Sequence, residues 1–274
     1  DYVGGLVGLN YYSTVSNSFY DKTKYTGDGV GNNSTHPGAT GKTTQEMSYG
    51  GTFKNASWDI IADSSVTSLT PVIKWDSINN KYVWAIAPLA LTYTLEDKTT
   101  TYNGTTQTLS SFYTSNPFTI PTGYEFLNLT SADYKFQVDG ADVTGYKDAG
   151  TYSNIKIASN SDFLTIANSG NTDGTFTINK ADATITANSD SKVYNGLIQN
   201  VSGFTVTGLV NNEDKSVLTG ITGDNASGKD VGVYNTALAG TDTNYNLTFE
   251  DGKLTITKAD LTATLNDNSK TYDG

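Results

Sequence analysis

Apolar residues and threonines alternate along several short stretches of the chain. Ala183, Ile185 and Ala187 are each separated by one Thr, and the same alternation occurs over residues 247–249 and 254–256. A period of two is typical of a β-strand with one buried and one exposed face. The pattern therefore predicts an all-β fold made of many short strands.

Turn and helix signals are sparse. Asp251–Gly252 lies between two alternating stretches, and Asp173–Gly174 occupies the matching place earlier in the chain. Asp-Gly is the signal for a two-residue type I′ hairpin, which we predict at both positions. Helical signals are limited to residues 211–218, where an Asn could cap one or two turns, and to residues 44–47.

The strongest signal is an internal repeat. Residues 173–196 and 251–274 align throughout at an offset of 78 residues, which matches Lys180 with Lys258 and Tyr194 with Tyr272. A less similar copy further upstream places Tyr102 at the same position. A fixed period of this length indicates tandem domains.

A second motif supports the same register, because K-D-A-G-T-Y begins at Lys147 and K-D-V-G-V-Y begins at Lys229. The units are predicted at 89–180 and 181–258, with at most one short helix each. Residues 259–274 form the start of a truncated third unit, so we expect the sequence to be part of a longer chain.

The sequence before residue 89 has a different composition and no copy of the repeat. Residues 1–46 contain short apolar runs separated by Gly, Asn and Ser, and then a polar loop. This favours the last coils of a β-helix solenoid, with Leu6 and Val7 in its narrow core. Residues 47–88 hold all three Trp residues of the chain, Trp58, Trp75 and Trp84, and are predicted to form a compact cap.

Composition narrows the functional classes. Aromatic residues make up 11% of the chain, which is high for a disordered segment, and hydrophobic residues make up 36%. The absence of Cys excludes disulfides, thiol catalysis and Cys-based metal sites. A net charge of -11 would repel nucleic acid, and no apolar run is long enough to predict a membrane span.

Residues that could carry chemistry are few. His36, the single His, lies in a polar stretch and is expected to be a solvated loop residue. The carboxylate pairs Asp139/Asp142 and Glu213/Asp214 could serve glycoside hydrolysis, but both lie in turn-like stretches, so turn chemistry is the favoured interpretation. No catalytic, cofactor-binding or metal-binding residue is predicted, and the Asp and Asn clusters leave a structural Ca²⁺ as a minor alternative.

Tyr102, Tyr194 and Tyr272 each precede an Asn-Gly or Asp-Gly turn. Aromatic rings in such positions could stack on a sugar. A framework role, in which the ring packs the domain and its hydroxyl bonds a turn, is favoured because the residue recurs at the same place in every unit.

The order of these motifs resembles one family of exported bacterial proteins. G-G-L-V-G-L-N from Gly4, S-N-S-F-Y-D from Ser16 and G-K-T-T-Q-E-M from Gly41 resemble the Gly-Leu-rich repeats that end the β-helix of filamentous-haemagglutinin-like exoproteins. The repeats with T-I-T-K-A-D and K-x-Y-[DN]-G resemble the YDG and MBG domains that follow such β-helices.

This resemblance implies β-grasp-like repeat domains in a secreted or cell-surface bacterial adhesin, exported by two-partner secretion or a similar route. The expected function is a semi-rigid stalk or spacer that takes part in adhesion, with neighbouring repeats of the same chain as partners. Two alternatives stay open: modules that bind glycans, mucin or matrix polysaccharide, and a self-associating extracellular filament or sheath. An enzyme is the least favoured interpretation.

Overall fold

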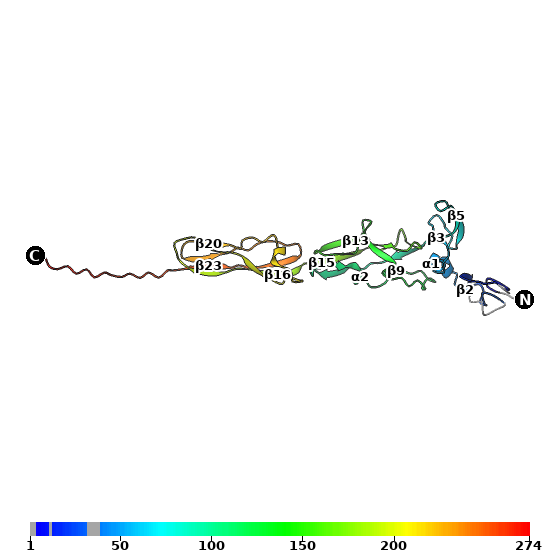
Figure 1. The fold of residues 1–274 in the computed structure, drawn as a ribbon, viewed down its shortest axis with the longest axis horizontal. Helices are drawn as coiled ribbons and strands as arrows, with labels where there is room; N and C mark the ends of the chain where they lie inside the picture. The colour runs from blue at the N-terminus through cyan, green and yellow to red at the C-terminus, as the bar shows by residue number, and fades with distance from the viewer. Residues whose placement is uncertain (1–3, 11–12, 32–38) are drawn as a thin grey trace. The chain divides into compact units, whose positions relative to one another are not determined.

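A computed structural model describes residues 4–10, 13–31 and 39–274 of the chain. These residues form an all-β protein with a few short helical turns (Figure 1). They divide into two compact units. The first comprises residues 1–98, 107–146 and 151–176, and the second comprises residues 99–106, 147–150 and 177–274.

The N-terminal segment pairs its strands in parallel. Strand β1 (Ser18–Asp21) runs parallel to β2 (Ala39–Lys42), and Val7 forms an isolated parallel bridge with Val30. Val30 is buried, but Leu6 is 47% exposed, so the prediction that Leu6 enters a shared core is wrong. Leu6 lies in a bend beside the Val7–Val30 bridge, whereas Val7 is partly buried.

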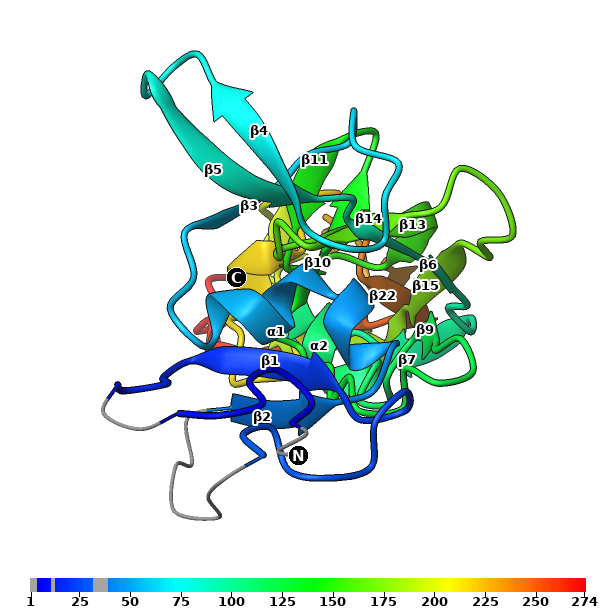
Figure 2. The same cartoon turned by 90° about the vertical axis from the view of Figure 1, so that its right-hand side faces the viewer.

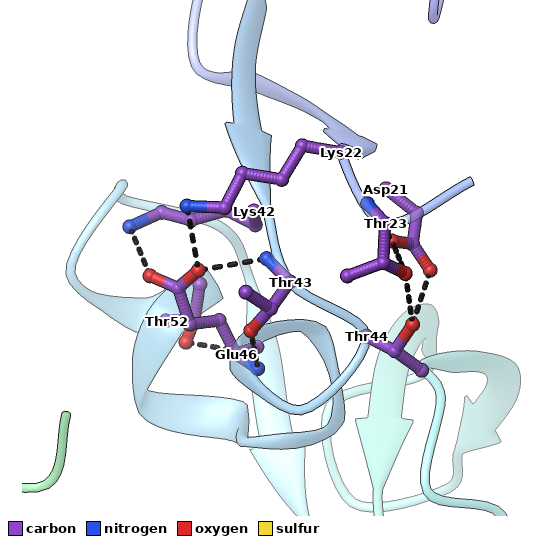
Figure 3. A network of polar contacts seen from close by, with 8 residues as sticks. All are labelled: Asp21, Lys22, Thr23, Lys42, Thr43, Thr44, Glu46 and Thr52. Atoms are coloured by element: carbon purple, nitrogen blue, oxygen red, sulfur yellow. Dashed lines mark hydrogen bonds and ion pairs between the residues drawn. The ribbon is translucent and has the colours of Figure 1, made fainter. Parts of the chain in front are cut away.

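A capping box begins the segment that follows (Figure 3). The backbone N–H of Glu46 donates to Thr43 Oγ1 at 3.0 Å, and the backbone N–H of Thr43 donates to Glu46 Oε2 at 2.7 Å. This reciprocal pair satisfies two donors at the start of the 3₁₀ turn η1 (Glu46–Ser48), which is followed by helix α1 (Gly50–Lys54). Lys42 and Lys22 then hold the same carboxylate from outside, at 3.1 and 3.6 Å.

A three-stranded sheet in the order β3-β5-β4 contacts α1 through β3, and its β4–β5 hairpin projects away from α1 (Figure 2); its strands are β3 (Ile60–Ala62), β4 (Val72–Asp76) and β5 (Lys81–Ile86). The core here is formed by Phe53, Ile60, Ile86 and Phe163, with Trp58 packed against it. Trp58 also donates from Nε1 to the carbonyl of Asn17 at 2.7 Å, which links this core to the segment before β1.

Two of the three Trp residues meet in this region. The rings of Trp58 and Trp84 lie 5.6 Å apart, whereas Trp75 is on the projecting β4–β5 hairpin and is 46% exposed. The prediction that all three Trp residues close one compact cap is therefore wrong for Trp75. Trp75 pairs with Tyr82 of β5, beyond residues 84–86 with which β3 pairs.

The first repeat contains two sheets and a small ribbon. Its elements are β6 (Leu89–Tyr93), β7 (Lys98–Thr101), β8 (Gln107–Thr108), α2 (Leu109–Phe112), β9 (Phe118–Thr119), β10 (Tyr134–Val138), β11 (Ala141–Val143), β12 (Gly145–Tyr146), β13 (Gly150–Ser159), β14 (Leu164–Ile166) and β15 (Gly174–Asn179). They are ordered β14-β6-β9, β11-β10-β13-β15-β7 and β12-β8.

The second repeat has matching elements. They are β16 (Ala181–Ala187), β17 (Asp190–Val193), β18 (Gln199–Val201), β19 (Phe204–Thr207), the 3₁₀ turn η2 (Lys215–Val217), β20 (Ala226–Gly228), β21 (Gly232–Asn235), β22 (Tyr245–Glu250) and β23 (Lys253–Thr257). Their sheets are ordered β22-β16-β19, β21-β23-β17 and β20-β18.

The two repeats therefore share one strand order. The orders β14-β6-β9 and β22-β16-β19 correspond strand by strand, as do β13-β15-β7 and β21-β23-β17. The first repeat differs by the hairpin β10–β11 at one sheet edge and by the α2 connection, which accounts for its additional residues. The alternation over residues 181–187 is also present, because Ala183, Ile185 and Ala187 are buried and Thr184 and Thr186 are less so.

The two Asp-Gly pairs connect different sheets and do not form the predicted hairpin turns. Strands β22 and β23 flank Asp251–Gly252 but lie in different sheets, so the predicted hairpin there is wrong. Asp173–Gly174 likewise joins two sheets. Gly252 is required for close packing, because a Cβ at this position would lie 2.2 Å from the Asn188 carbonyl oxygen.

The two-residue hairpin lies elsewhere, at Asp139–Gly140. Val138 of β10 pairs with Ala141 of β11, and the two residues between them have φ values of 50° and 81°. Positive φ at both positions is what a type I′ turn requires.

The short helical turn of the second repeat is capped by Asp214. Its side chain accepts from the Ser216 backbone N–H at 2.9 Å, whereas Asn211 and Asn212 adopt positive φ in the preceding loop. The predicted Asn cap is therefore wrong. A left-handed Asn cannot hold the extended conformation that an N-cap residue needs.

The boundary between the two compact units differs from the boundary between the sequence repeats at residues 180 and 181. Residues 99–106 and 147–150 belong by sequence to the first repeat, yet they cluster with the second unit. Residues 258–274, which include the predicted start of the third repeat at 259, carry no assigned helix or strand. Within the described ranges no helix is long and apolar enough to cross a membrane.

Candidate functional site

A buried polar cluster in the second unit joins three segments that are distant in sequence. Tyr102 follows β7, Glu213 lies in the loop before η2, and Tyr245 begins β22. Tyr102 Oη donates to Glu213 Oε1 at 2.7 Å, and Tyr245 Oη donates to Glu213 Oε2 at 2.6 Å. The two rings meet edge to face with their centroids 5.4 Å apart. One carboxylate therefore accepts from both tyrosines.

Burial raises the pKa of both tyrosines in this cluster. Tyr102 and Tyr245 are only 4% and 2% exposed. Burial, together with the hydrogen bond to the Glu213 carboxylate, raises the pKa of Tyr245 to about 12 and raises the pKa of Tyr102 further. Both phenols are therefore neutral donors at physiological pH. Hydrogen bonds to an ionised acceptor are stronger than neutral ones, so this arrangement stabilises the unit.

The turn after Tyr102 packs on the same region. Gly104 has a φ of +78°, and a Cβ built on it would lie 2.7 Å from Asn211 Cβ and 3.2 Å from Glu213 Oε1. Only Gly combines this left-handed conformation with so close an approach. The Asn-Gly turn of the repeat motif therefore has a packing role.

A second loop of the same unit is held by Asn244. The backbone N–H of Ala149 donates to Asn244 Oδ1 at 2.8 Å, and Asn244 Nδ2 donates to Asp148 Oδ1 at 3.1 Å. The Asn244 carbonyl also accepts from the Ala181 backbone N–H at 2.9 Å. These bonds join the start of the K-D-A-G motif to the strands that begin the second repeat.

The three motif tyrosines differ in their surroundings. Tyr102 is buried, Tyr194 is 38% exposed and Tyr272 is exposed. Tyr102 thus has the framework role, but its hydrogen-bond acceptor is a carboxylate distant in sequence. The sequence assigned Glu213 to turn chemistry, and no local pattern signals its contact with the tyrosines.

The remaining predicted residues do not converge. His36 lies outside the described residues. Asp139 occupies the β10–β11 turn, and Asp142 accepts from Lys135 Nζ at 2.8 Å and Gln137 Nε2 at 2.7 Å. Within the described part of the chain, no group of three or more His, Cys, Asp or Glu side chains could hold a metal ion.

The first unit has a cavity of about 390 Å³ beside the capping box, lined by Lys42, Glu46, Tyr49, Thr52, Asn55, residues 126–129 and Asp133. Burial alone would raise the pKa of Glu46, but its bonds from the Thr43 N–H and from Lys42 lower it. The Glu46 carboxylate is thus engaged by the cap, and the second carboxylate of the lining, Asp133, accepts from the Thr130 backbone N–H at 2.7 Å.

Four large side chains, three of them aromatic, form what we call the aromatic stripe along one face of the β4–β5 hairpin. We define it as Ile73, Trp75, Tyr82 and Trp84. Trp75 pairs with Tyr82 and Ile73 with Trp84 across the two strands, and the Trp75 and Tyr82 rings meet edge to face at 5.0 Å. All four side chains are more than one third exposed. An exposed stripe of this kind marks a surface suited to a partner.

Comparison with known proteins gives one family match, which lies in the second repeat. Residues 183–255 match the family model described as MBG domain (YGX type). These residues run from Ala183 within β16, through β22, to Thr255 in β23, and they include Glu213 and Tyr245. No curated protein matches the chain. The match is consistent with an adhesin-like repeat domain, and MBG domains are typical of extracellular surface proteins.

Proposed function

We propose that this chain is a segment of a secreted bacterial surface adhesin and acts there as a semi-rigid stalk. The observation that carries the proposal is the shared strand order of the two repeats, together with the MBG match in the second. Repeats that stack in sequence extend a protein without enlarging any single core. Such a chain holds a binding region away from the cell surface.

Two features favour stiffness over free tumbling. Lys180 is the single residue between β15 and β16, and one residue spans only about 3.5 Å. Lys180 is itself held, because its Nζ donates to the Asp242 carbonyl at 2.6 Å. A flexible tether of Gly and Ser would behave in the opposite way.

Small-angle X-ray scattering tests this stalk. The full chain should fit one narrow set of conformations. A matched variant with Gly-Gly-Ser-Gly-Gly-Ser inserted after Lys180 should give a broader distribution of maximum dimensions. Equal breadth in both chains would contradict the stalk.

We also propose that the N-terminal segment is the end of a β-helix and that the chain has a structural role and no catalytic one. The parallel pairs Val7–Val30 and β1–β2 support the final coils of a β-helix like that of filamentous-haemagglutinin-like exoproteins. The Tyr102, Glu213 and Tyr245 side chains are fully engaged with one another, which favours a structural role over an enzymatic one.

A second candidate function is glycan binding, which the aromatic stripe favours. Flat aromatic faces suit the C–H surfaces of sugars, and the neighbouring ion pair Lys81–Asp59 at 2.6 Å supplies polar groups. Affinity electrophoresis of the full chain in gels containing mucin or matrix polysaccharide tests it. Trp75→Ala and Tyr82→Ala should abolish the retardation, and Ile78→Ala, an exposed residue of the hairpin loop, should not. Unretarded wild-type chain would remove this candidate.

A further inference from the structure

The Asn195–Gly196 turn of the second repeat corresponds to the Asn103–Gly104 turn of the first, which packs inside the second unit. Gly104 and Gly196 both have a φ of +78°. Around Gly104 lie Asn211 and Glu213, whereas a Cβ at Gly196 would meet nothing within 4 Å. The turn therefore has the same conformation with and without a packing partner.

The backbone around the two tyrosines is also equivalent. The Tyr102 N–H donates to the Asn179 carbonyl at 2.8 Å, and the Tyr194 N–H donates to the Thr257 carbonyl at 2.9 Å. Asn179 and Thr257 each end the last strand of their repeat. Tyr194 is thus held in the same backbone position as Tyr102, but it is about ten times more exposed, at 38% against 4%.

The Tyr194 turn and the loop 229–231 lie at one end of the second unit. Val193 pairs with Thr257 at the end of β23, and Gly232 pairs with Ile256 one residue earlier. Val231 in that loop is 47% exposed, whereas Ala149, its counterpart in K-D-A-G, is partly covered. Asn211, Glu213 and Asn244 contact the Tyr102 turn and the loop 147–149. The corresponding Tyr194 turn and loop 229–231 are therefore uncovered.

We infer that residues 194–196 and 229–231 form a preformed docking surface for the next repeat of the same chain. The occupant is a repeat that begins directly after Lys258 and presents an Asn-x-Glu loop and an Asn-Tyr pair, as residues 211–213 and 244–245 do here. Tyr194 Oη then donates to the incoming carboxylate, and the incoming Asn side chain bonds the Asp230–Val231 backbone.

The start of that repeat is already visible in the sequence. Leu261 and Leu265 match Ala183 and Ala187, which are buried in β16, yet both leucines are exposed here. A second copy of the present chain is a poorer occupant, because its Glu213 already accepts hydrogen bonds from its own Tyr102 and Tyr245. The inference rests on the proposed stalk only in requiring that repeats follow one another.

Tyrosine footprinting by hydroxyl radicals tests the surface. An extended chain repeats residues 181–258 once more directly after Lys258, and this added copy carries Tyr194→Phe so that a single Tyr194 reports. Modification of Tyr194 should fall about tenfold from the rate in the unextended chain, towards the rate of Tyr102. An unchanged rate would overturn the inference.

Three controls make the result specific. Glu213→Gln in the added copy should restore part of the Tyr194 reactivity, whereas the same change in the original copy should leave Tyr194 protected. Leu197→Thr should also leave it protected, because its counterpart Thr105 is exposed beside a covered Tyr102.

Two other outcomes count against the surface. An added copy that fails to fold, judged by a reactive Tyr245 in that copy, would show that the Tyr194 turn cannot replace the Tyr102 turn. Protection that depends on the concentration of the unextended chain would instead assign the surface to a second molecule. Either result leaves the scattering test of the stalk unaffected.

Discussion

Tyr102 Oη lies 2.7 Å from Glu213 Oε1, across 111 residues of sequence. The tyrosine belongs by sequence to the first repeat and the glutamate to the second, yet both lie in one compact unit. The repeat that matches the MBG family thus includes, in its folded unit, a loop from outside the matched residues. Nearest-neighbour coupling of this kind is how repeat proteins gain stability.

Loss of the Tyr102 hydroxyl should destabilise the second unit. Tyr102→Phe keeps the ring packing and removes one hydrogen bond to a carboxylate, for an expected loss of about 1.5–3 kcal/mol in the free energy of unfolding. Urea denaturation followed by near-ultraviolet circular dichroism measures it. Tyr194→Phe is the matched control and should change stability by less than about 0.5 kcal/mol. Equal losses in both variants would contradict the role of the cluster.

The two turns give a second matched pair. Gly196→Ala should cost about 1–2 kcal/mol, because Ala disfavours the left-handed conformation. Gly104→Ala has the same φ but also places a Cβ 2.7 Å from Asn211 Cβ, and overpacking adds about 1–3 kcal/mol. The difference between the two variants in thermal unfolding therefore reports the packing of the Gly104 turn. No difference would mean that the turn is not packed.

The tyrosine cluster predicts an alkaline transition. An unfolded tyrosine has a pKa near 10, whereas the pKa of Tyr245 in the folded unit is about 12. Below pH 10 both states are protonated and the stabilisation is complete. Above pH 10 the unfolded chain releases its proton first, so stability falls as the pH rises through 12. The fall should be shallower in Tyr245→Phe than in the wild type when urea midpoints are compared from pH 9 to 12. Parallel curves would contradict this assignment.

The capping box predicts an acid effect in the first unit. The pKa of Glu46 is lowered in the folded state, so its stabilisation is present above the unfolded pKa near 4.3 and is lost as the pH falls. Glu46→Gln should be less stable than wild type at pH 7 and nearly equal to it at pH 3. A Thr43→Ala variant should lose about 1 kcal/mol, the usual contribution of a cap side chain. A Glu46→Gln deficit that persists at pH 3 would contradict the ionic role.

Part of this structure could be predicted from the sequence. The period-two alternation fixed the buried face of β16, and the 78-residue offset indicated two copies with one strand order. Such patterns are local, or they compare one segment directly with another. These patterns predict the fold class and the register of the repeats well.

The site could not be predicted in the same way. Glu213 meets Tyr102 and Tyr245 only after the sheets have assembled, and its neighbours Asn212 and Asp214 made it look like a turn residue. The Asp-Gly signals failed for a related reason: Gly252 serves a close backbone approach between sheets, and only Asp139–Gly140 has the positive φ values of a hairpin turn. The dipeptide is the same in both places, and the tertiary contact decides its use.

We propose that consecutive repeats hold one another in a fixed arrangement, and double electron–electron resonance tests this proposal most directly. The chain has no Cys, so exposed Ser131→Cys and Asn225→Cys provide unique spin-label sites in the first and second units. We predict a single narrow distance distribution that broadens when Tyr102→Phe and Asn244→Ala are combined. A broad distribution in the otherwise wild-type chain would contradict the account.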